Sequence, residues 1–161
     1  MYRHVLVAID GSLTSDLALR EAFKFASAGA KLTAVTVVDN PLVNVGYDTT
    51  KFMTFDYDQA HEEFLQEAKL ILENAAYDAD RLAGVKIETQ LVDMGIKSDR
   101  REISTAIERA AAACDADLIV MGTHGRRGFQ RFLLGSVAEH VIRNVHIPVL
   151  LIRDQTDDRP K

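Results

Sequence analysis

The residues with the clearest chemical potential are the glycines that follow the apolar run Leu118–Met121. Two residues separate Gly122 from Gly125, and nine more precede the pair Gly135-Ser136, where a helical pattern begins. Glycines let a backbone approach an anion closely, and the free N–H groups at a helix start point toward it. The order of apolar run, glycine-spaced loop and helix start therefore predicts a phosphate-binding site.

The spacing of these glycines differs from the two commonest phosphate-binding motifs. No lysine precedes Ser136, so the loop is not G-x-x-x-x-G-K-[ST], and the first strand is followed by Gly11 alone instead of G-x-G-x-x-G. Three arginines in the loop, Arg126, Arg127 and Arg131, add positive charge that suits a phosphate. Spacing alone leaves a second interpretation open, in which the glycines only shape a connection between a strand and a helix.

Apolar runs alternate with helical patterns along the chain, and this alternation indicates how the loop is positioned. The expected strands are Val5–Ile9, Lys31–Val38, Val85–Val92, Leu118–Met121 and Val149–Ile152, and the expected helices cover roughly 14–28, 57–82, 98–113 and 136–144. Ser12 or Thr14 is expected to cap the first helix and Ser136 the last. The alternation is typical of a parallel sheet with helices on both faces, where ligands bind beyond the carboxyl ends of the strands. If the first and fourth strands are neighbours, the loops after Ile9 and Met121 meet, but the residue pattern alone does not decide this.

The bulk composition is typical of one globular domain. The 161 residues are 47% hydrophobic and 27% charged, which suits a single core. The expected domain spans residues 1–153, with an irregular, aromatic-rich insertion at 40–58 and a polar tail at 154–161. The aromatic side chains of the insertion are expected to tether it to the body, and an interaction surface is the alternative.

Charge and cysteine content argue against several classes of protein. A net charge of -5 argues against a nucleic-acid-binding protein, which would carry a basic face. No stretch approaches the length of a membrane span, so no membrane partner is expected. The single cysteine, Cys114, cannot form an internal disulfide, which favours a reducing compartment and predicts a cytoplasmic protein. Its expected place on the core side of a helix gives Cys114 a packing role.

Several separated motifs resemble the universal stress protein family. The stretches VLVAIDGS, ADLIVMGTHG and PVLLI occur in the family's order. Gly122, Gly125, Gly135 and Ser136 fill the pattern G-x2-G-x9-G-[ST] of its nucleotide-binding members. The resemblance covers essentially the whole chain, and residues 40–58 match least. It implies an α/β fold of three layers, Rossmann-like and similar to the adenine nucleotide alpha hydrolases, with five parallel strands in the order 3-2-1-4-5.

The resemblance also implies ATP as the ligand. Gly122, Gly125, Gly135, Ser136 and Val137 are then expected to surround the phosphates, mainly through backbone N–H groups. The other residues that the resemblance places at the site are His124 and Arg126 in the same loop, Met121 near the ribose, Asp10 near the nucleoside beside Ala8 and Ile9, and Val37 near adenine. The five histidines are scattered, so Mg²⁺ or Mn²⁺ is expected to be held by the phosphates instead of a protein metal site.

The enzymatic potential of these residues is limited. Hydrolysis would need a positioned base and a charge clamp, for which His124 and Arg126 are the candidates, but nothing else in the sequence organises a nucleophile. Family members are mostly nucleotide-binding regulators. The favoured function is therefore a nucleotide-dependent regulatory switch in the stress response. A slow ATPase at the same site and a dimeric interaction module without nucleotide are the alternatives, and Asp10 has its own alternative role in a turn with Gly11.

A homodimer is the expected assembly. The last strand, Val149–Ile152, would expose apolar side chains and unpaired backbone groups at a sheet edge. Pairing with a second copy, which the resemblance also implies, would cover both. A further protein partner is left open.

Overall fold

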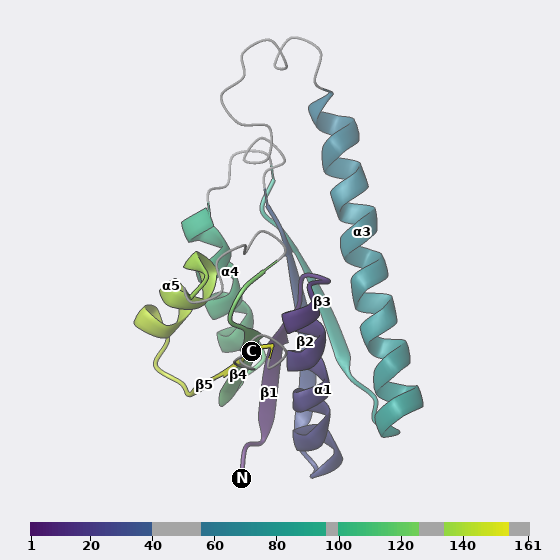
Figure 1. The fold of residues 1–161 in the computed structure, drawn as a ribbon, viewed down its shortest axis with the longest axis vertical. Helices are drawn as coiled ribbons and strands as arrows, with labels where there is room; N and C mark the ends of the chain where they lie inside the picture. The colour runs from purple at the N-terminus through teal and green to yellow at the C-terminus, as the bar shows by residue number, and fades with distance from the viewer. Residues whose placement is uncertain (40–55, 96–99, 126–133, 155–161) are drawn as a thin grey trace, which may run out of the picture.

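The computed structural model describes residues 1–39, 56–95, 100–125 and 134–154 (Figure 1). Helices and strands alternate along these residues as the apolar runs predict. The elements are β1 (His4–Ala8), α1 (Leu13–Ser27), β2 (Lys31–Val38), α3 (Tyr57–Asp78) with a π-helical turn (Ala79–Ala83), β3 (Glu88–Asp93), α4 (Arg100–Ala113), β4 (Leu118–Gly122), α5 (Ser136–Asn144) and β5 (Val149–Ile152). Within the described ranges, no helix combines the length and the apolar character that crossing a membrane requires.

The five strands form one parallel sheet in the order β3-β2-β1-β4-β5. This order confirms the predicted α/β fold. The register pairs Val5 with Leu118 and Ala8 with Met121, so β4 lies directly beside β1. Because the two strands are parallel neighbours, the loops that follow them start at the same edge of the sheet. The strand order reverses between β1 and β4, and ligands of open α/β sheets bind beyond the carboxyl ends of the strands at such a point.

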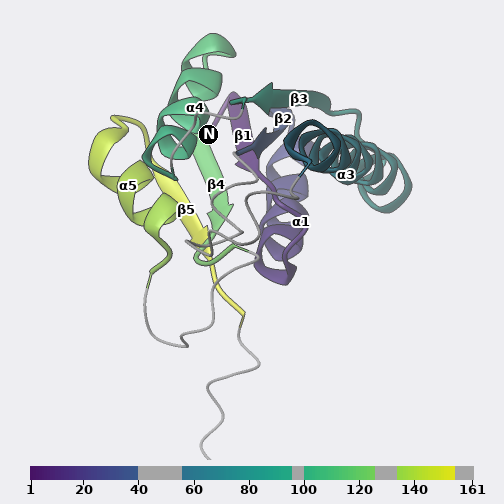
Figure 2. The same cartoon turned by 90° about the horizontal axis from the view of Figure 1, so that it is seen from above.

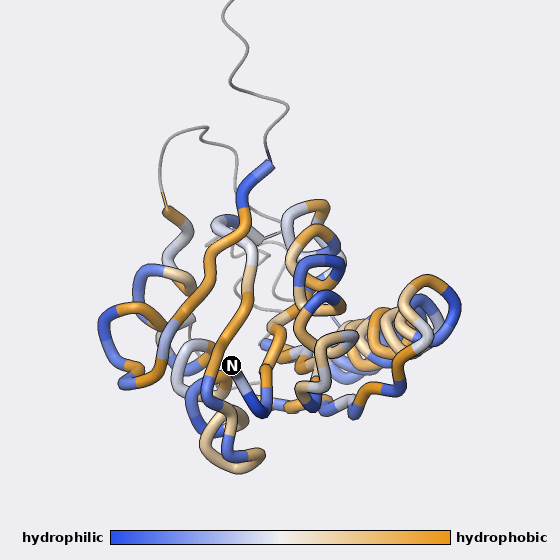
Figure 3. The backbone as a smooth tube through the Cα atoms, turned by 90° about the horizontal axis from the view of Figure 1, so that it is seen from below, coloured by the Kyte–Doolittle hydropathy of each residue, from blue (hydrophilic) through white to orange (hydrophobic). Residues whose placement is uncertain are grey.

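Two hydrophobic clusters cover the two faces of the sheet. Helices α1 and α3 pack on one face and α4 and α5 on the other (Figure 2), and apolar residues concentrate along the strands between them (Figure 3). Val5 and Val7 belong to the α1/α3 cluster and Leu6 to the α4/α5 cluster, because successive strand residues point to opposite faces. Cys114 packs against the α4/α5 cluster, and burial raises the pKa of its thiol, consistent with a packing role.

Side-chain caps set the starts of two helices, of which α1 begins one residue before the prediction and α3 begins where predicted. Helix α1 begins at Leu13 because the Ser12 side chain caps it, accepting a hydrogen bond from the backbone N–H of Ser15. Helix α3 begins at Tyr57 because the Asp56 carboxylate accepts a hydrogen bond from the N–H of Gln59 at 3.0 Å. The predicted irregular insertion therefore ends before residue 58, and its remainder, 40–55, lies outside the described residues.

Strand β3 starts later than the alternating pattern predicts. Val85 and Ile87 already pack on the α1/α3 cluster, which accounts for their apolar character. The backbone pairs with β2 only from Glu88, opposite Thr33. An alternating pattern reflects which side chains are buried. Here the side chains are buried before the backbone joins the sheet.

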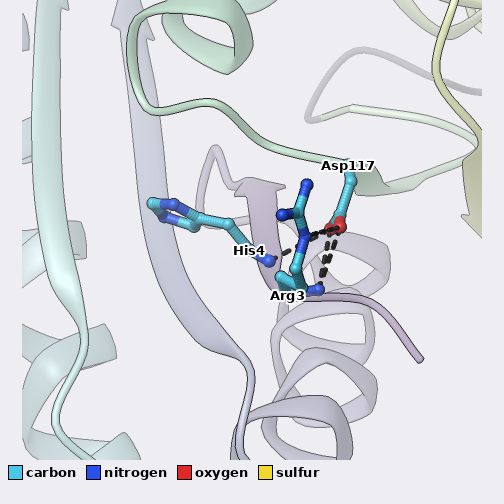
Figure 4. Close-up of polar contacts among 3 residues, drawn as sticks. All are labelled: Arg3, His4 and Asp117. Atoms are coloured by element: carbon cyan, nitrogen blue, oxygen red, sulfur yellow. Dashed lines mark hydrogen bonds and ion pairs between the residues drawn. The ribbon is translucent and has the colours of Figure 1, made fainter.

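Asp117 joins the amino-terminal ends of β1 and β4 (Figure 4). Its carboxylate accepts hydrogen bonds from the backbone N–H groups of Arg3 and His4, each at 3.0 Å, and its own N–H donates to the His4 carbonyl at 2.9 Å. The Arg3 guanidinium also lies 3.5 Å away, but its side chain is 90% exposed, so this ion pair contributes little. The backbone hydrogen bonds from His4 and Arg3 hold the pKa of Asp117 below its usual value.

Replacing Asp117 with asparagine is expected to destabilise the protein at neutral pH and much less in acid. A carboxylate with a depressed pKa stabilises the fold above its unfolded pKa, about 3.9, and loses this effect as the pH falls through the folded value. Urea midpoints of wild type and Asp117→Asn should differ at pH 7 and converge toward pH 3. Arg3→Gln, which removes only the exposed guanidinium, should leave the midpoint at pH 7 nearly unchanged. An equal difference at both pH values would show that the carboxylate charge is not responsible.

Candidate functional site

A cleft of about 370 Å³ opens at the carboxyl ends of β1, β2 and β4. Its walls are formed by the ends of these strands with the loops that follow β1 and β4, by the start of α5, and by one face of α4. The lining residues are Ala8, Ile9, Asp10, Ser15, Val35, Val37, Asp39, Ile103, Ile107, Met121, Gly122, Thr123, His124, Gly125, Gly135, Ser136, Val137 and Ala138.

Eleven of the twelve residues predicted at the site line this one cleft. They come from segments more than 100 residues apart, and the twelfth, Arg126, lies outside the described residues. The prediction missed seven lining residues: Ser15, Val35, Asp39, Ile103, Ile107, Thr123 and Ala138. Of these, Thr123 lies within the glycine loop, a position that could have identified it, whereas Ile103 and Ile107 have the helical spacing of ordinary core residues.

Part of the cleft lining is apolar. Val35, Ile107 and Met121 are buried members of the α4/α5 cluster, and Val37 and Ile103 pack against the same cluster. These side chains come from β2, β4 and α4, so the apolar surface exists only where the three elements meet. A flat apolar ring system would fit such a surface, because ligand sites are typically apolar with a few directed polar groups.

Asp10 lines the cleft and also organises the turn after β1. Its carboxylate accepts a hydrogen bond from the N–H of Ser12 at 3.0 Å, and its own N–H donates one to the Ser15 hydroxyl oxygen at 3.3 Å. Gly11 adopts a φ of 77°, a left-handed conformation that favours glycine. The turn role considered for Asp10 is therefore confirmed, and the same residue lines the cleft.

Gly122 and Gly125 lie against the first loop. A Cβ atom on Gly122 would come within 2.6 Å of the Thr14 hydroxyl oxygen and 3.0 Å of the Thr14 backbone carbon. A Cβ atom on Gly125 would come within 2.6 Å of an Asp10 carboxylate oxygen. The glycine spacing thus serves contact between the two loops, a reason that the sequence pattern did not reveal.

The start of helix α5 offers backbone donors to the cleft. Gly135, and not Ser136 as predicted, is its N-cap, because Gly135 has extended backbone angles (φ −64°, ψ 147°) and Ser136 is already helical. The Gly135 N–H donates to the Thr123 carbonyl at 2.8 Å. A glycine cap has no side chain to pair with the next donors, so the N–H groups of Ser136, Val137 and Ala138 have no acceptor among the described residues. These donors can bind an anion.

The titratable side chains of the described lining are two carboxylates and one imidazole. Asp10 and Asp39 supply the carboxylates, and His124 lies with its Nδ1 atom 3.0 Å from the Thr123 hydroxyl oxygen. No lysine or arginine belongs to the described part of the lining. Across the described residues, no group of three or more histidine, cysteine, aspartate or glutamate side chains could hold a metal ion.

Comparison with known proteins agrees with this geometry. The family model described as "Universal stress protein family" matches residues 1–153. The chain belongs to the universal stress protein family. A curated relative, universal stress protein MJ0531 of Methanocaldococcus jannaschii, is 34% identical over 155 residues, covering 95% of this chain and 83% of the relative.

Solved structures of universal stress proteins share the fold. A family member from Burkholderia pseudomallei has 34% sequence identity and a TM-score of 0.70, with 94% of this chain and 96% of that chain covered. The universal stress protein from Archaeoglobus fulgidus, solved in complex with dAMP, has 27% identity and a TM-score of 0.62, with 94% and 98% covered. The present universal stress protein thus resembles a nucleotide-bound relative over nearly its full length.

Proposed function

We propose that this universal stress protein binds ATP in the cleft and acts as a cytoplasmic, nucleotide-dependent regulatory switch in the stress response. The observation that carries the proposal is that two different kinds of surface line one cleft. An apolar surface at Val37 and Met121 suits a base, and the unpaired donors at the start of α5 suit phosphates. The relative solved with dAMP supports an adenine nucleotide as the ligand class.

Each predicted site residue other than His124 then has a role in binding. Val37 contacts the adenine, with Met121 nearer the ribose, and Asp10 hydrogen-bonds the nucleoside. Ser136 and Val137 donate backbone N–H groups to the phosphates, and Gly125 approaches from the facing loop. Ala8, Ile9, Gly122 and Gly135 shape the cleft, and Arg126, outside the described residues, adds positive charge from the same loop.

A divalent cation would accompany the phosphates. The described lining offers two carboxylates, Asp10 and Asp39, and no protein metal site. Two carboxylates facing an uncompensated triphosphate would repel it. Mg²⁺ or Mn²⁺ held by the phosphates themselves reduces this repulsion, so we propose that the nucleotide binds as its metal complex.

Two substitutions of nearly equal size at Ser136 test the ATP site. Ser136 is exposed and is the first residue of α5, where an acidic side chain is compatible with the helix. Ser136→Asp should weaken ATP binding at least about tenfold by charge repulsion, and Ser136→Asn by no more than about threefold. Calorimetric titration with ATP and with adenosine separates the phosphate end from the base end, and adenosine affinity should not change. Failure of the wild-type protein to bind ATP would overturn the proposal in favour of a nucleotide-free interaction module.

Slow ATP hydrolysis is a second candidate, favoured by one contact. The Thr123 hydroxyl lies 3.0 Å from the His124 Nδ1 atom and can orient the imidazole toward a water molecule. Phosphate release, measured on the same samples, distinguishes the two functions. Release that disappears in His124→Ala while ATP binding persists would make the protein an ATPase; no release above background supports the switch.

A homodimer through β5 completes the proposal. Strand β5 is the outermost strand on its side of the sheet, and no described strand pairs with its other edge. A second copy offers the same unpaired edge, so a two-fold pairing would satisfy both. A regulatory switch also needs a partner that responds to it. A protein of unknown identity would recognise the nucleotide-dependent state of the dimer.

A further inference from the structure

A threonine outside the cleft contacts the loop that would hold the phosphates. The Thr14 hydroxyl, in the first turn of α1, donates a hydrogen bond to the backbone carbonyl of His124. Thr14 is not among the residues that line the cleft, whereas His124 and Gly125 both are. Any effect of Thr14 on a ligand therefore has to act through the peptide unit that it holds.

The contact is tight because the surrounding residues leave little space. The Thr14 hydroxyl oxygen lies 2.6 Å from the position of a Cβ atom on Gly122, so only glycine at 122 allows this approach. The Ser12 hydroxyl lies 3.3 Å from the same Thr14 oxygen. Ser12 is the N-cap of α1, so the donor that reaches His124 projects from a helix start that is itself held in place.

The geometry of the peptide bond fixes the direction of the neighbouring N–H group. In a trans peptide the C=O and N–H bonds point in opposite directions, and no described peptide bond is cis. Because the His124 carbonyl points at α1, the N–H of the next residue, Gly125, points away from α1. That N–H has no acceptor among the described residues, and its residue lines the cleft.

We propose that Thr14 is a positioning residue that holds the His124–Gly125 peptide with its N–H directed at the phosphates. This inference rests on the proposed ATP binding and adds a determinant of phosphate affinity. Without the hydroxyl, the His124 carbonyl loses this hydrogen bond, and rotation of the peptide would turn an oxygen toward the phosphates. A charge-assisted N–H donor would then be exchanged for a repulsive carbonyl oxygen.

Two conservative substitutions separate the hydroxyl from the shape of the side chain. Thr14→Val keeps the branched shape and removes the donor, and Thr14→Ser keeps the donor and removes a methyl group. We expect Thr14→Val to raise the Kd for ATP about tenfold and leave the Kd for adenosine within about twofold of wild type. Thr14→Ser should bind both ligands within about twofold of wild type. The amide signal of Gly125 in ¹⁵N NMR spectra should shift on ATP addition in wild type and Thr14→Ser, and shift little in Thr14→Val.

Each other outcome has a definite meaning. Equal ATP affinity in wild type and Thr14→Val would overturn the positioning role and leave the proposed ATP site intact. Loss of adenosine and ATP binding to the same degree would also overturn it, because the effect would be general and not confined to the phosphates. If Thr14→Val fails to fold, Thr14→Ala takes its place with the same expectations. If wild type binds no ATP, both the site and the role of Thr14 fail together.

Discussion

Replacing Gly122 with alanine is expected to lower the free energy of unfolding by about 2–3 kcal/mol, since inserting a methyl group into a well-packed site typically costs about 1–3 kcal/mol. The added Cβ atom would lie 2.6 Å from the hydroxyl oxygen, 2.9 Å from the Cβ and 3.0 Å from the backbone carbon of Thr14. A backbone atom in the first turn of α1 cannot swing aside, so the helix itself would have to move. Denaturant unfolding of wild type and variant measures the loss.

Gly125→Ala is the matched comparison for this effect. Its added Cβ atom would meet only the end of the Asp10 side chain, with a carboxylate oxygen at 2.6 Å and Cγ at 3.8 Å. A side-chain terminus can rotate, so the loss of stability should stay below about 1 kcal/mol. The displaced carboxylate lines the cleft, so nucleoside affinity should fall instead. Equal destabilisation by both substitutions would contradict the distinction between backbone and side-chain contact.

Leu151→Asp is expected to convert the proposed dimer into monomers, raising the dimer dissociation constant by at least about 100-fold, which corresponds to about 2.7 kcal/mol. The N–H groups of Ile119 in β4 and of Thr123, just after it, donate to the carbonyls of Pro148 and Ile152. The alternate β5 residues, Val149 and Leu151, therefore direct their backbone N–H and C=O groups to the open edge. A two-fold pairing at this edge would bring the two introduced carboxylates close together, and like charges in an interface are costly. Light scattering after size-exclusion chromatography measures the mass.

Leu70→Asp is the control for this substitution. Leu70 is 56% exposed on α3, which packs on the other face of the sheet near the opposite edge. The same leucine-to-aspartate change there should leave the dimer intact. A dimer that survives both Leu151→Asp and Val149→Asp would place the interface elsewhere, and a monomeric wild-type protein would remove the homodimer from the proposal.

Local sequence patterns predict most of the helices and strands of the fold. Two strands have the predicted bounds, Lys31–Val38 and Val149–Ile152. Short β-branched and aliphatic runs between turn residues strongly favour a strand. The position of the glycine loop after β4 follows from the same local pattern. Family resemblance then supplied the strand order and the nucleotide, and the observed sheet confirms the order.

The sites where loops contact one another were not predictable from local patterns. The helical spacing of Ile103 and Ile107 indicates a core-facing side of α4, but it does not reveal that this side ends at an open cleft. The cap of α5 moved from Ser136 to Gly135 because the Gly135 N–H pairs with the Thr123 carbonyl across the loop. Such a contact depends on how the chain between β4 and α5 brings its two ends together.

The sequence alone determined which residues could form a phosphate loop and which runs would build a parallel sheet. Only the tertiary structure decided why Gly122 and Gly125 are glycines, since their α-carbons lie against Thr14 and Asp10, in a segment more than 100 residues earlier in the chain. The physical reason is that periodicity and turn signals act over a few neighbouring residues, whereas a close contact between loops depends on the packed sheet that brings them together.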